Sequence, residues 1–236
     1  MPTYNILYPL LLSFTFFTGC NSQTLPLSKA TRYGTFKYTE YDKTSVEDII
    51  KICDAQLNKI SGDFKLKIDK NTIIEIYPSQ TEYDRFIINP DLKGSPAISG
   101  NRVIQLVSPK SKIKIDTISY QNRLYFVIHE YVHIMLDQLD SPPPIYLDEG
   151  LACYYSSYDF YHSIIKEHFG EIKQMPTIEQ LQNHYYEIPA ADIFSFLVID
   201  YLINSKKEPI SKILRQPAGI LSENAQWIQY ITARYQ

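Results

Sequence analysis

The pattern of apolar residues changes once along this chain, at about residue 116, and this change constrains the fold more than any other feature. Before it, apolar and polar residues alternate over short segments bounded by Gly, Pro and Asn, which is typical of strands. After it, apolar residues recur every three or four positions, which is typical of helices. The sequence therefore predicts an α+β fold: a small N-terminal β-sheet subdomain with one or two helices, then a mainly helical C-terminal half.

The same patterns predict the individual elements. In the first half we expect strands at 35–41, 64–68, 72–77 and 102–107, helices at 44–62 and 79–86, and a loop at 89–100. In the second half we expect helices at 119–139, 146–157, 190–204, 210–215 and 223–235. Gly62 is expected to end the helix that begins near residue 44, and the prolines at 142–144 to end the first of the later helices.

Composition excludes some classes of protein. The chain has 236 residues, of which 44% are hydrophobic, so it can bury the core of one domain or of two small ones. Its net charge of −3 gives no basic surface for DNA or RNA, and nucleic acid is not an expected partner. No repeat of 20 to 50 residues is present, which argues against solenoids and propellers. A monomer is expected.

The N-terminus carries a short apolar segment, Ile6–Thr18, which is too short to span a bilayer because a spanning helix needs about 20 residues. It is typical of a secretory signal, and its end at Phe17-Thr18-Gly19-Cys20 resembles a bacterial lipoprotein signal, in which the Cys is acylated after cleavage. Two features depart from that pattern: Phe17 stands where Leu is usual, and residues 1–5 contain no Lys or Arg. The alternative is a buried N-terminal helix, which Pro9 disfavours.

This resemblance implies a domain organisation and a location. Residues 1–19 would be a signal peptide, 20–32 a lipid-anchored tether that begins at Cys20, and 33–236 the folded domain. The protein would be exported and anchored by lipid in a bacterial cell envelope, on the periplasmic or surface side. Such a compartment permits a disulfide between Cys53 and Cys153, but both lie in apolar patterns, so buried free thiols are favoured.

The helix expected at 119–139 contains His129-Glu130-Tyr131-Val132-His133. Two His four residues apart lie on one face of a helix, and the Glu beside the first can reach a water that a metal holds there. This is the HExxH pattern of zinc hydrolases, which a shuffled chain of this composition would contain about once in two hundred. Two histidines on a helix surface without metal are the simpler alternative, but they fit poorly in an apolar helix.

Catalytic zinc takes three protein ligands and leaves a position for water. The continuation HExxHxxGxxH is excluded, because Leu136 and Leu139 stand where it needs Gly and His. A Glu from the following helix is the other known solution, and Glu149 in Tyr-Leu-Asp-Glu-Gly-Leu-Ala supplies it, with fifteen residues between it and His133. The proline turn at 142–144 would fold this second helix back beside the first.

These two motifs together resemble the gluzincin metallopeptidases, and most of all the peptidase MA-like domain family. The similarity extends from about Tyr33 to Tyr235 and includes weaker matches in the strands and in the helix around Ala-Asp-Ile-Phe-Ser-Phe-Leu. It implies one zinc ion per chain held by His129, His133 and Glu149, with Glu130 as general base and a peptide or protein as substrate. It also implies that the strand 102–107 is the sheet edge on which an extended peptide lies.

Zinc chemistry then suggests the reaction: the ion acidifies its bound water, Glu130 takes the proton, and the hydroxide attacks a peptide carbonyl. Two roles stay open. Larger gluzincins place an Asp four residues after the Glu ligand, where this chain has Cys153, so the side chain that orients a ligand must come from elsewhere, with Asp137 and Asp148 as candidates. The residue that stabilises the oxyanion is not fixed by a motif, and the candidates are Tyr154, His162, His168, His184 and Tyr201.

Three functions fit these motifs. The leading hypothesis is a lipid-anchored zinc metallopeptidase. A second is a surface lipoprotein that keeps the fold but acts as a catalytically silent binding or assembly module; the presence of Glu130 beside the complete ligand set argues against it. A third is an intracellular zinc hydrolase whose N-terminus is an ordinary helix, and acylation of Cys20 distinguishes it from the first. A fold resemblance alone does not establish peptide substrates.

Overall fold

The computed structural model describes residues 25–112, 118–172, 174–215, 217, 219–220 and 224–235. These residues form two compact units. The sheet unit contains the described residues up to 59 and those from 67 to 135; the helical unit contains residues 60–66 and those from 136 onward. A mixed sheet near the N-terminus followed by a mostly helical region confirms the predicted α+β class.

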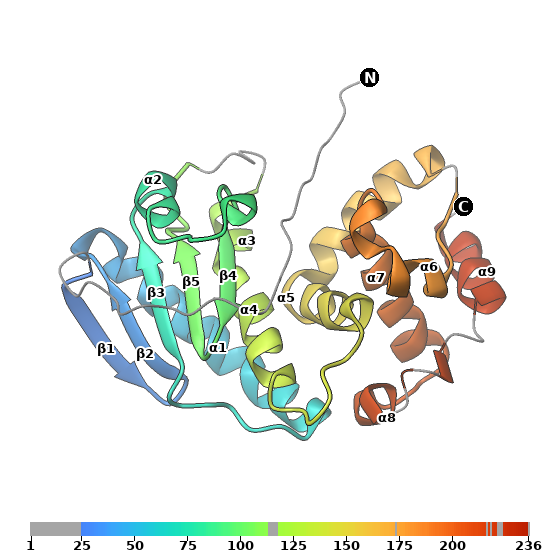
Figure 1. The fold of residues 1–236 in the computed structure, drawn as a ribbon, viewed down its shortest axis with the longest axis horizontal. Coiled ribbons are helices and arrows are strands. Elements are labelled where there is room, and N and C mark those ends of the chain that lie inside the picture. The colour runs from blue at the N-terminus through green and yellow to red at the C-terminus, as the bar shows by residue number, and fades with distance from the viewer. Residues whose placement is uncertain are drawn as a thin grey trace. The chain divides into compact units, whose positions relative to one another are not determined.

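The sheet unit is built on five strands in the order β1-β2-β3-β5-β4 (Figure 1). The strands are β1 Leu27–Thr31, β2 Gly34–Tyr38, β3 Ile73–Tyr77, β4 Ala97–Gly100 and β5 Val103–Val107. The three central strands β2, β3 and β5 are parallel, and the two edge strands pair antiparallel with their neighbours. Since β2 and β3 are parallel, the chain must return between them, and it does so through α1, Lys43–Phe64, which crosses behind the sheet in Figure 1.

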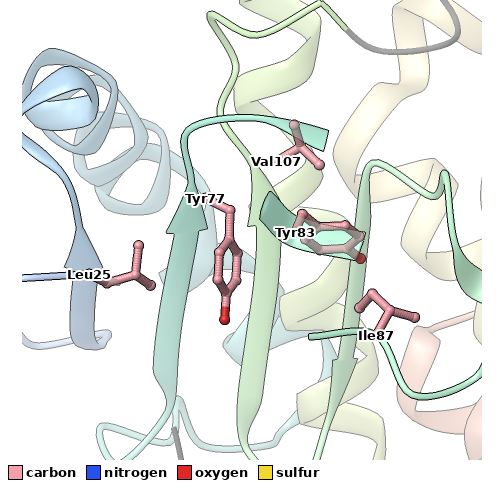
Figure 2. Packing of buried hydrophobic residues seen from close by; sticks show 5 residues of the cluster. All are labelled: Leu25, Tyr77, Tyr83, Ile87 and Val107. Atoms are coloured by element: carbon pink, nitrogen blue, oxygen red, sulfur yellow. The ribbon is translucent and has the colours of Figure 1, made fainter. Parts of the chain in front are cut away.

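Five buried side chains, here called the Leu25 cluster, pack together: Leu25, Tyr77, Tyr83, Ile87 and Val107 (Figure 2). The Tyr77 ring meets that of Tyr83 edge-on at 5.9 Å and stacks on Phe86 at 5.0 Å. Tyr83 reaches this position from α2, Gln80–Asp84, which Ser79 caps by accepting a hydrogen bond from the Glu82 backbone N–H.

The remaining elements of the sheet unit are the short helices η1 Glu40–Asp42, η2 Pro90–Leu92 and α3 Tyr120–Leu124, and the helix α4 Phe126–Leu136. The single helix expected at 119–139 is therefore two helices. They separate at Tyr125, the C-cap of α3, whose φ of −80° and ψ of −8° depart from regular α-helical values but stay in the right-handed helical region. Phe126, the first residue of α4, packs against the Leu25 cluster. This contact fixes the beginning of the helix that carries the HExxH pattern.

The helical unit begins with α5, Ile145–His168, which is twice as long as the sequence predicts. The expected end at Ser157 is a kink, because Ser157 has φ −145° and ψ 34° inside the helix. The expected helices at 190–204, 210–215 and 223–235 are confirmed. The elements after α5 are η3 Phe169–Glu171, α6 Ile178–Asn183, η4 Tyr185–Glu187, α7 Ala191–Asp200, the π-helical turn η5 Tyr201–Ser205, α8 Ile210–Arg215 and α9 Asn224–Tyr235.

A buried carboxylate joins three helices of this unit. The Asp200 side chain is fully buried and pairs with Arg234 of α9, whose Nη1 lies 2.7 Å from Oδ2. Its other oxygen accepts hydrogen bonds from the Tyr158 hydroxyl at 3.0 Å and from Asn204 Nδ2 at 2.7 Å. Because every contact compensates the buried charge, this network stabilises the attachment of α9 to α5 and α7.

Two predicted elements of the first half are wrong. The strand expected at 64–68 does not form: helix α1 continues past Gly62 to Phe64, whose ring meets that of Tyr155 edge-on at 5.3 Å. The helical stripe of α1 reaches Phe64, and this outweighs the local alternation. The helix ends where Lys65 adopts φ +59°.

The segment expected to be a loop at 89–100 contains strand β4, which pairs with β5 across a turn at Asn101 and Arg102, both with positive φ. Gly and Pro in this segment hide the strand from a search for alternation. The pairing also overturns a second expectation. The strand around 103–107 is not an edge of the sheet, because β4 occupies that side and β3 the other. Among the described strands, the free edges belong to β1 and β4.

The sheet also begins earlier than the expected domain boundary. Strand β1 lies within the segment 20–32 that the sequence assigns to a tether, and it pairs with β2 from Leu27 to Thr31. Residues 1–24, and with them the signal peptide and Cys20, lie outside the described residues. Of the described helices, none combines the length and the apolar character that crossing a membrane requires. Cys53 and Cys153 are buried free thiols, as the sequence predicts.

Asp42 gives a prediction about stability. It is fully buried at the end of η1, where it accepts a hydrogen bond from the Ser108 hydroxyl, and burial raises its pKa despite that bond and the nearby Lys110. A pKa raised by folding means that the folded state binds the proton more tightly, so stability falls as pH rises from the unfolded pKa through the folded one. We expect the wild type to lose up to about 1.4 kcal/mol per pH unit in that window relative to Asp42→Asn.

Urea denaturation between pH 3 and pH 8 measures this difference. Asp48→Asn is the control, and its effect has the opposite dependence on pH. A hydrogen bond from Lys51 lowers the pKa of Asp48, so the small contribution of Asp48 to the free energy of unfolding is lost as pH falls. Parallel stability curves for the wild type and Asp42→Asn would contradict the prediction.

Candidate metal centre

Helix α4 presents the residues of the HExxH pattern from an almost completely buried segment. All its apolar residues except the partly buried Phe126 are buried, and the helix begins at the Leu25 cluster. One helical turn separates His129 from His133, and their ring centroids lie 4.8 Å apart with an interplanar angle of 75°. His133 and Glu130 are only 4% and 5% exposed, and His129 is half-buried. The imidazoles of His129 and His133 and the carboxylate of Glu130 thus lie in a region largely shielded from water.

Helix α5 presents Glu149 from its first two turns. The proline run ends at Pro144, the N-cap, whose carbonyl accepts from the backbone N–H groups of Leu147 and Asp148 at 2.9 and 3.1 Å. Tyr146 and Leu147, in the first turn of α5, are fully buried, and their burial fixes the rotation of the helix about its axis. Glu149 itself is half-buried.

Potential ligand atoms of His129, His133 and Glu149 all lie within 4.8 Å of one another. Nitrogen and oxygen ligands bind zinc at about 2.0 to 2.2 Å, so atoms that share one ion lie about 3 to 4 Å apart. The group is therefore compatible with a metal ion after small side-chain rotations. Two imidazoles and one carboxylate also leave a coordination position open, as catalytic zinc sites do. The distances alone do not select zinc over other metals that accept these ligands.

Within the helical unit, Glu149 belongs to a larger group of polar residues. Tyr161 donates a hydrogen bond to Asp192 of α7 at 3.1 Å and accepts one from Cys153 at 3.2 Å. Burial, with a smaller contribution from the charge of Glu149, raises the pKa of Asp192 to about 6. Burial and then the charge of Glu149 raise the pKa of Tyr185 as well. Glu149 therefore lies near a second acid, Asp192, and near the phenol of Tyr185, which stays protonated at neutral pH.

The sequence missed Tyr185 and Asp192. Asp192 had a visible signal, because it interrupts a helix that is otherwise apolar nearly all round, and a polar residue in a buried helix needs a partner. Tyr185 had none: it is one of 20 tyrosines and follows a short helix, α6, that the sequence does not predict. Only the packing of η4 within the helical unit brings it near Glu149.

In the sheet unit, the charge of Glu130 acts on Tyr83. Burial raises the pKa of the Tyr83 phenol, and the charge of Glu130 is the next cause. The Tyr83 hydroxyl is buried, and among the described residues it has no hydrogen-bond partner. Tyr83 is thus a protonated phenol on the Leu25 cluster, within electrostatic reach of Glu130.

The sequence-predicted candidates for supporting roles lie in different places. Asp148 is half-buried in the first turn of α5, next to Glu149. Asp137 is exposed and follows the last residue of α4, so it does not extend the helical column of the two histidines as expected. Cys20 lies outside the described residues.

Of the five oxyanion candidates, three belong to the aromatic network around Arg234. The Tyr154 hydroxyl lies 3.4 Å from Asn204 Nδ2, His162 Nε2 lies 3.1 Å from Arg234 Nη2, and the Tyr201 ring lies 5.5 Å from that of Tyr230. His184 is exposed and lies 3.5 Å from Glu187, and His168 is the last residue of α5. Two phenols outside these five, Tyr185 and Tyr186, have pKa values that burial and then the charge of Glu149 raise.

The residue after Glu149 gives a second stability prediction. A Cβ built on Gly150 would lie 2.6 Å from the backbone oxygen of Ser195 and 2.8 Å from Ile199 Cγ1, so α5 and α7 touch at this glycine. We expect Gly150→Ala to destabilise the protein by about 3 kcal/mol, because a backbone atom must move. The matched control is Gly62→Ala in α1, where no atom lies within 4 Å of the added carbon and helix propensity favours Ala by about 1 kcal/mol.

Urea denaturation of both variants gives the two free energies of unfolding. A Gly150→Ala variant as stable as Gly62→Ala would mean that the α5–α7 contact is looser than the structure has it.

No family model matches this chain, and a search of curated proteins finds no similar sequence. Its function therefore has to be inferred from the residues themselves.

Proposed function

We propose that this protein is a zinc-dependent metallopeptidase that hydrolyses peptide bonds, with one zinc ion held by His129, His133 and Glu149 and with Glu130 as general base. The observation that carries the proposal is the close approach of the three ligand side chains, with a buried Glu beside the first His. A metal site built only for structure has no need of that fourth residue.

In this proposal Glu130 moves the protons, and the zinc ligands place the ion beside it. A zinc ion bound there would supply an acidified water and a positive charge beside the substrate carbonyl. Glu130 would accept the proton of the attacking water and later deliver it to the leaving amine. Because Glu130 is buried, solvent competes little for that proton.

Tyr185 is the proposed donor to the oxygen on which negative charge develops. A phenol is protonated at neutral pH and can donate a hydrogen bond to a developing oxyanion, and Tyr185 is close enough to Glu149 for the charge of that residue to raise its pKa. Asp192 and Tyr161 are proposed to hold the surroundings of Glu149 in place, taking the part that the sequence offered to Asp137 or Asp148.

We further propose that the protein is exported and anchored by lipid on Cys20, on the basis of the Phe17-Thr18-Gly19-Cys20 motif. Mass spectrometry of the protein from a bacterial membrane fraction tests this directly. A mature chain that begins at an acylated Cys20 supports it, and an unmodified chain that still carries residues 1–19 contradicts it.

The proposed activity is tested on the purified full chain, stripped with a chelator and reloaded with zinc. We expect one equivalent of bound zinc, cleavage of a mixed peptide library, and loss of cleavage on removal of the metal. Zinc bound without cleavage would favour the alternative of a binding or assembly module. Absence of zinc binding would refute the metal site itself.

A further inference from the structure

The chain enters the sheet unit at the Leu25 cluster. Leu25 is only 9% exposed, although it lies two residues before strand β1, and it packs with Tyr77, Tyr83, Ile87 and Val107 (Figure 2). Burying a Leu side chain contributes about 2 kcal/mol, so this residue is a real attachment point rather than part of a loose linker.

The same cluster adjoins the proposed catalytic helix. Phe126, the first residue of α4, packs against it, and the helical rise places His129 and His133 about 4.5 and 10 Å further along the axis. Tyr83, a member of the cluster, responds to the charge of Glu130. The entry point of the chain and the HExxH residues therefore lie close together in one compact unit.

The motif that the proposed activity leaves unused, Cys20, is close to this point along the chain. Only residues 21–24 separate Cys20 from Leu25. Whatever their conformation, the Cα atoms of Cys20 and Leu25 can lie at most about 18 Å apart, because an extended chain spans at most about 3.6 Å per residue. A tether of residues 20–32 would have reached more than twice as far.

The surface around the cluster suits a lipid headgroup region. Ile88, next to buried Ile87, is 58% exposed, and Arg85 and Lys93, which precede and follow it in the sequence, are exposed as well. The acidic residues of α2 are partly satisfied within the unit: Asp84 accepts from Gln80 Nε2 at 2.8 Å and from the Gly94 backbone N–H at 3.0 Å. An apolar side chain flanked by cations is the pattern that interfacial segments show toward anionic lipids.

We infer that the lipid on Cys20 and the buried Leu25 together hold the α2 end of the sheet unit against the membrane surface, so that the HExxH helix acts on polypeptide segments close to the bilayer. This inference rests on the proposed lipidation and activity. It narrows the substrate class to the membrane-adjacent segments of lipid-attached or membrane-spanning proteins, because the short tether prevents the site from reaching far into solution.

Proximity is tested without any substrate. A fluorophore is placed on the lipidated full chain at Thr81→Cys in α2 or at Lys70→Cys, which precedes β3 and lies one strand length away, about 16 Å. Both residues are exposed, whereas Cys53 and Cys153 are buried and will not compete for label. Energy transfer to a lipid dye is measured in vesicles of phosphatidylethanolamine and phosphatidylglycerol.

We expect transfer from residue 81 to exceed transfer from residue 70. Insertion of 40 Gly/Ser residues between Thr24 and Leu25, a linker with a root-mean-square length of about 35 Å, should at least halve both signals. Equal transfer from the two labels, or transfer that does not change on insertion, would overturn the inference.

The consequence for substrates is tested with a cleavable library peptide tethered to the same vesicles by a spacer of either 5 or 60 residues. We expect the short-spacer peptide to be cleaved at least about tenfold faster, and the 40-residue insertion to remove that preference while leaving hydrolysis of the free peptide unchanged. Cleavage of the free peptide without any dependence on spacer length would overturn the inference and leave the proposed activity standing. Failure to cleave any of the three peptides would count against the activity itself, and the fluorescence result would still decide the orientation.

Discussion

Glu130→Gln should lower kcat/KM for peptide cleavage by at least about a thousandfold while the protein keeps one equivalent of zinc. The amide matches the carboxylate in shape, so the buried site in α4 stays packed, but it cannot take a proton from water. General acid–base groups contribute about 10² to 10⁴ to the rate, and here one residue would serve both steps. Steady-state kinetics on a library-derived peptide, with metal content measured on the same sample, give both quantities.

The matched control for this change is Asp137→Asn, which also converts a carboxylate to an amide. Asp137 is exposed and lies one residue beyond the end of α4, so its loss should leave kcat/KM within about a factor of three. Retention of a tenth or more of the activity by Glu130→Gln would show that the proton acceptor is another group. Loss of zinc from Glu130→Gln would instead assign Glu130 to the ligand set.

Glu149→Gln should weaken zinc binding by at least about a hundredfold, more than is typical for residues that only orient a ligand. The substitution removes the negative charge from the proposed ligand set and leaves two neutral imidazoles, while the amide keeps the volume of the side chain. Competition with a chromophoric chelator measures the affinity. We expect the activity of the variant at saturating zinc to be low as well, because the two histidines alone do not fix the position of the ion.

Asp148→Asn provides the comparison, since the two acids are neighbours in the first two turns of α5. Asp148 is not in the group of close ligand atoms, so the zinc affinity of the Asp148→Asn variant should stay within about tenfold of that of the wild type. Equal losses in the two variants would mean that the effect is one of net charge near the histidines. A larger loss in Asp148→Asn would exchange the roles of the two residues.

The environment of Glu149 differs from what the motif alone suggested. The position four residues later is Cys153, and a thiol is a poor partner for a metal-bound His or Glu when it is fully buried and its pKa is raised. The acid that the sequence appeared to lack comes from α7 as Asp192, linked to Cys153 through the Tyr161 hydroxyl. We propose that this carboxylate, although distant in sequence, has the role that an Asp on the same helix has in larger gluzincins.

The sequence alone determined the fold class and the residues that point to a metal. Helical periodicity is a local property, so it located α4, α5 and α7, and two His with a Glu at HExxH spacing share a helix face in any fold. The proline run was enough to place the start of α5, because Pro supplies no donor for a continuing helix.

Tertiary structure decided the rest, because those features depend on contacts between segments that are distant in sequence. Local alternation predicted a strand at 64–68, but packing of Phe64 on Tyr155 keeps the residue in α1. Breakers hid β4, and only its pairing with β5 shows which strand is the edge. Asp192 comes near Glu149 through the packing of α5 and α7 at Gly150, where the absence of a side chain permits the close approach, and Tyr185 comes near it through the packing of η4. Burial of Leu25, which no local pattern indicates, sets how short the proposed tether is.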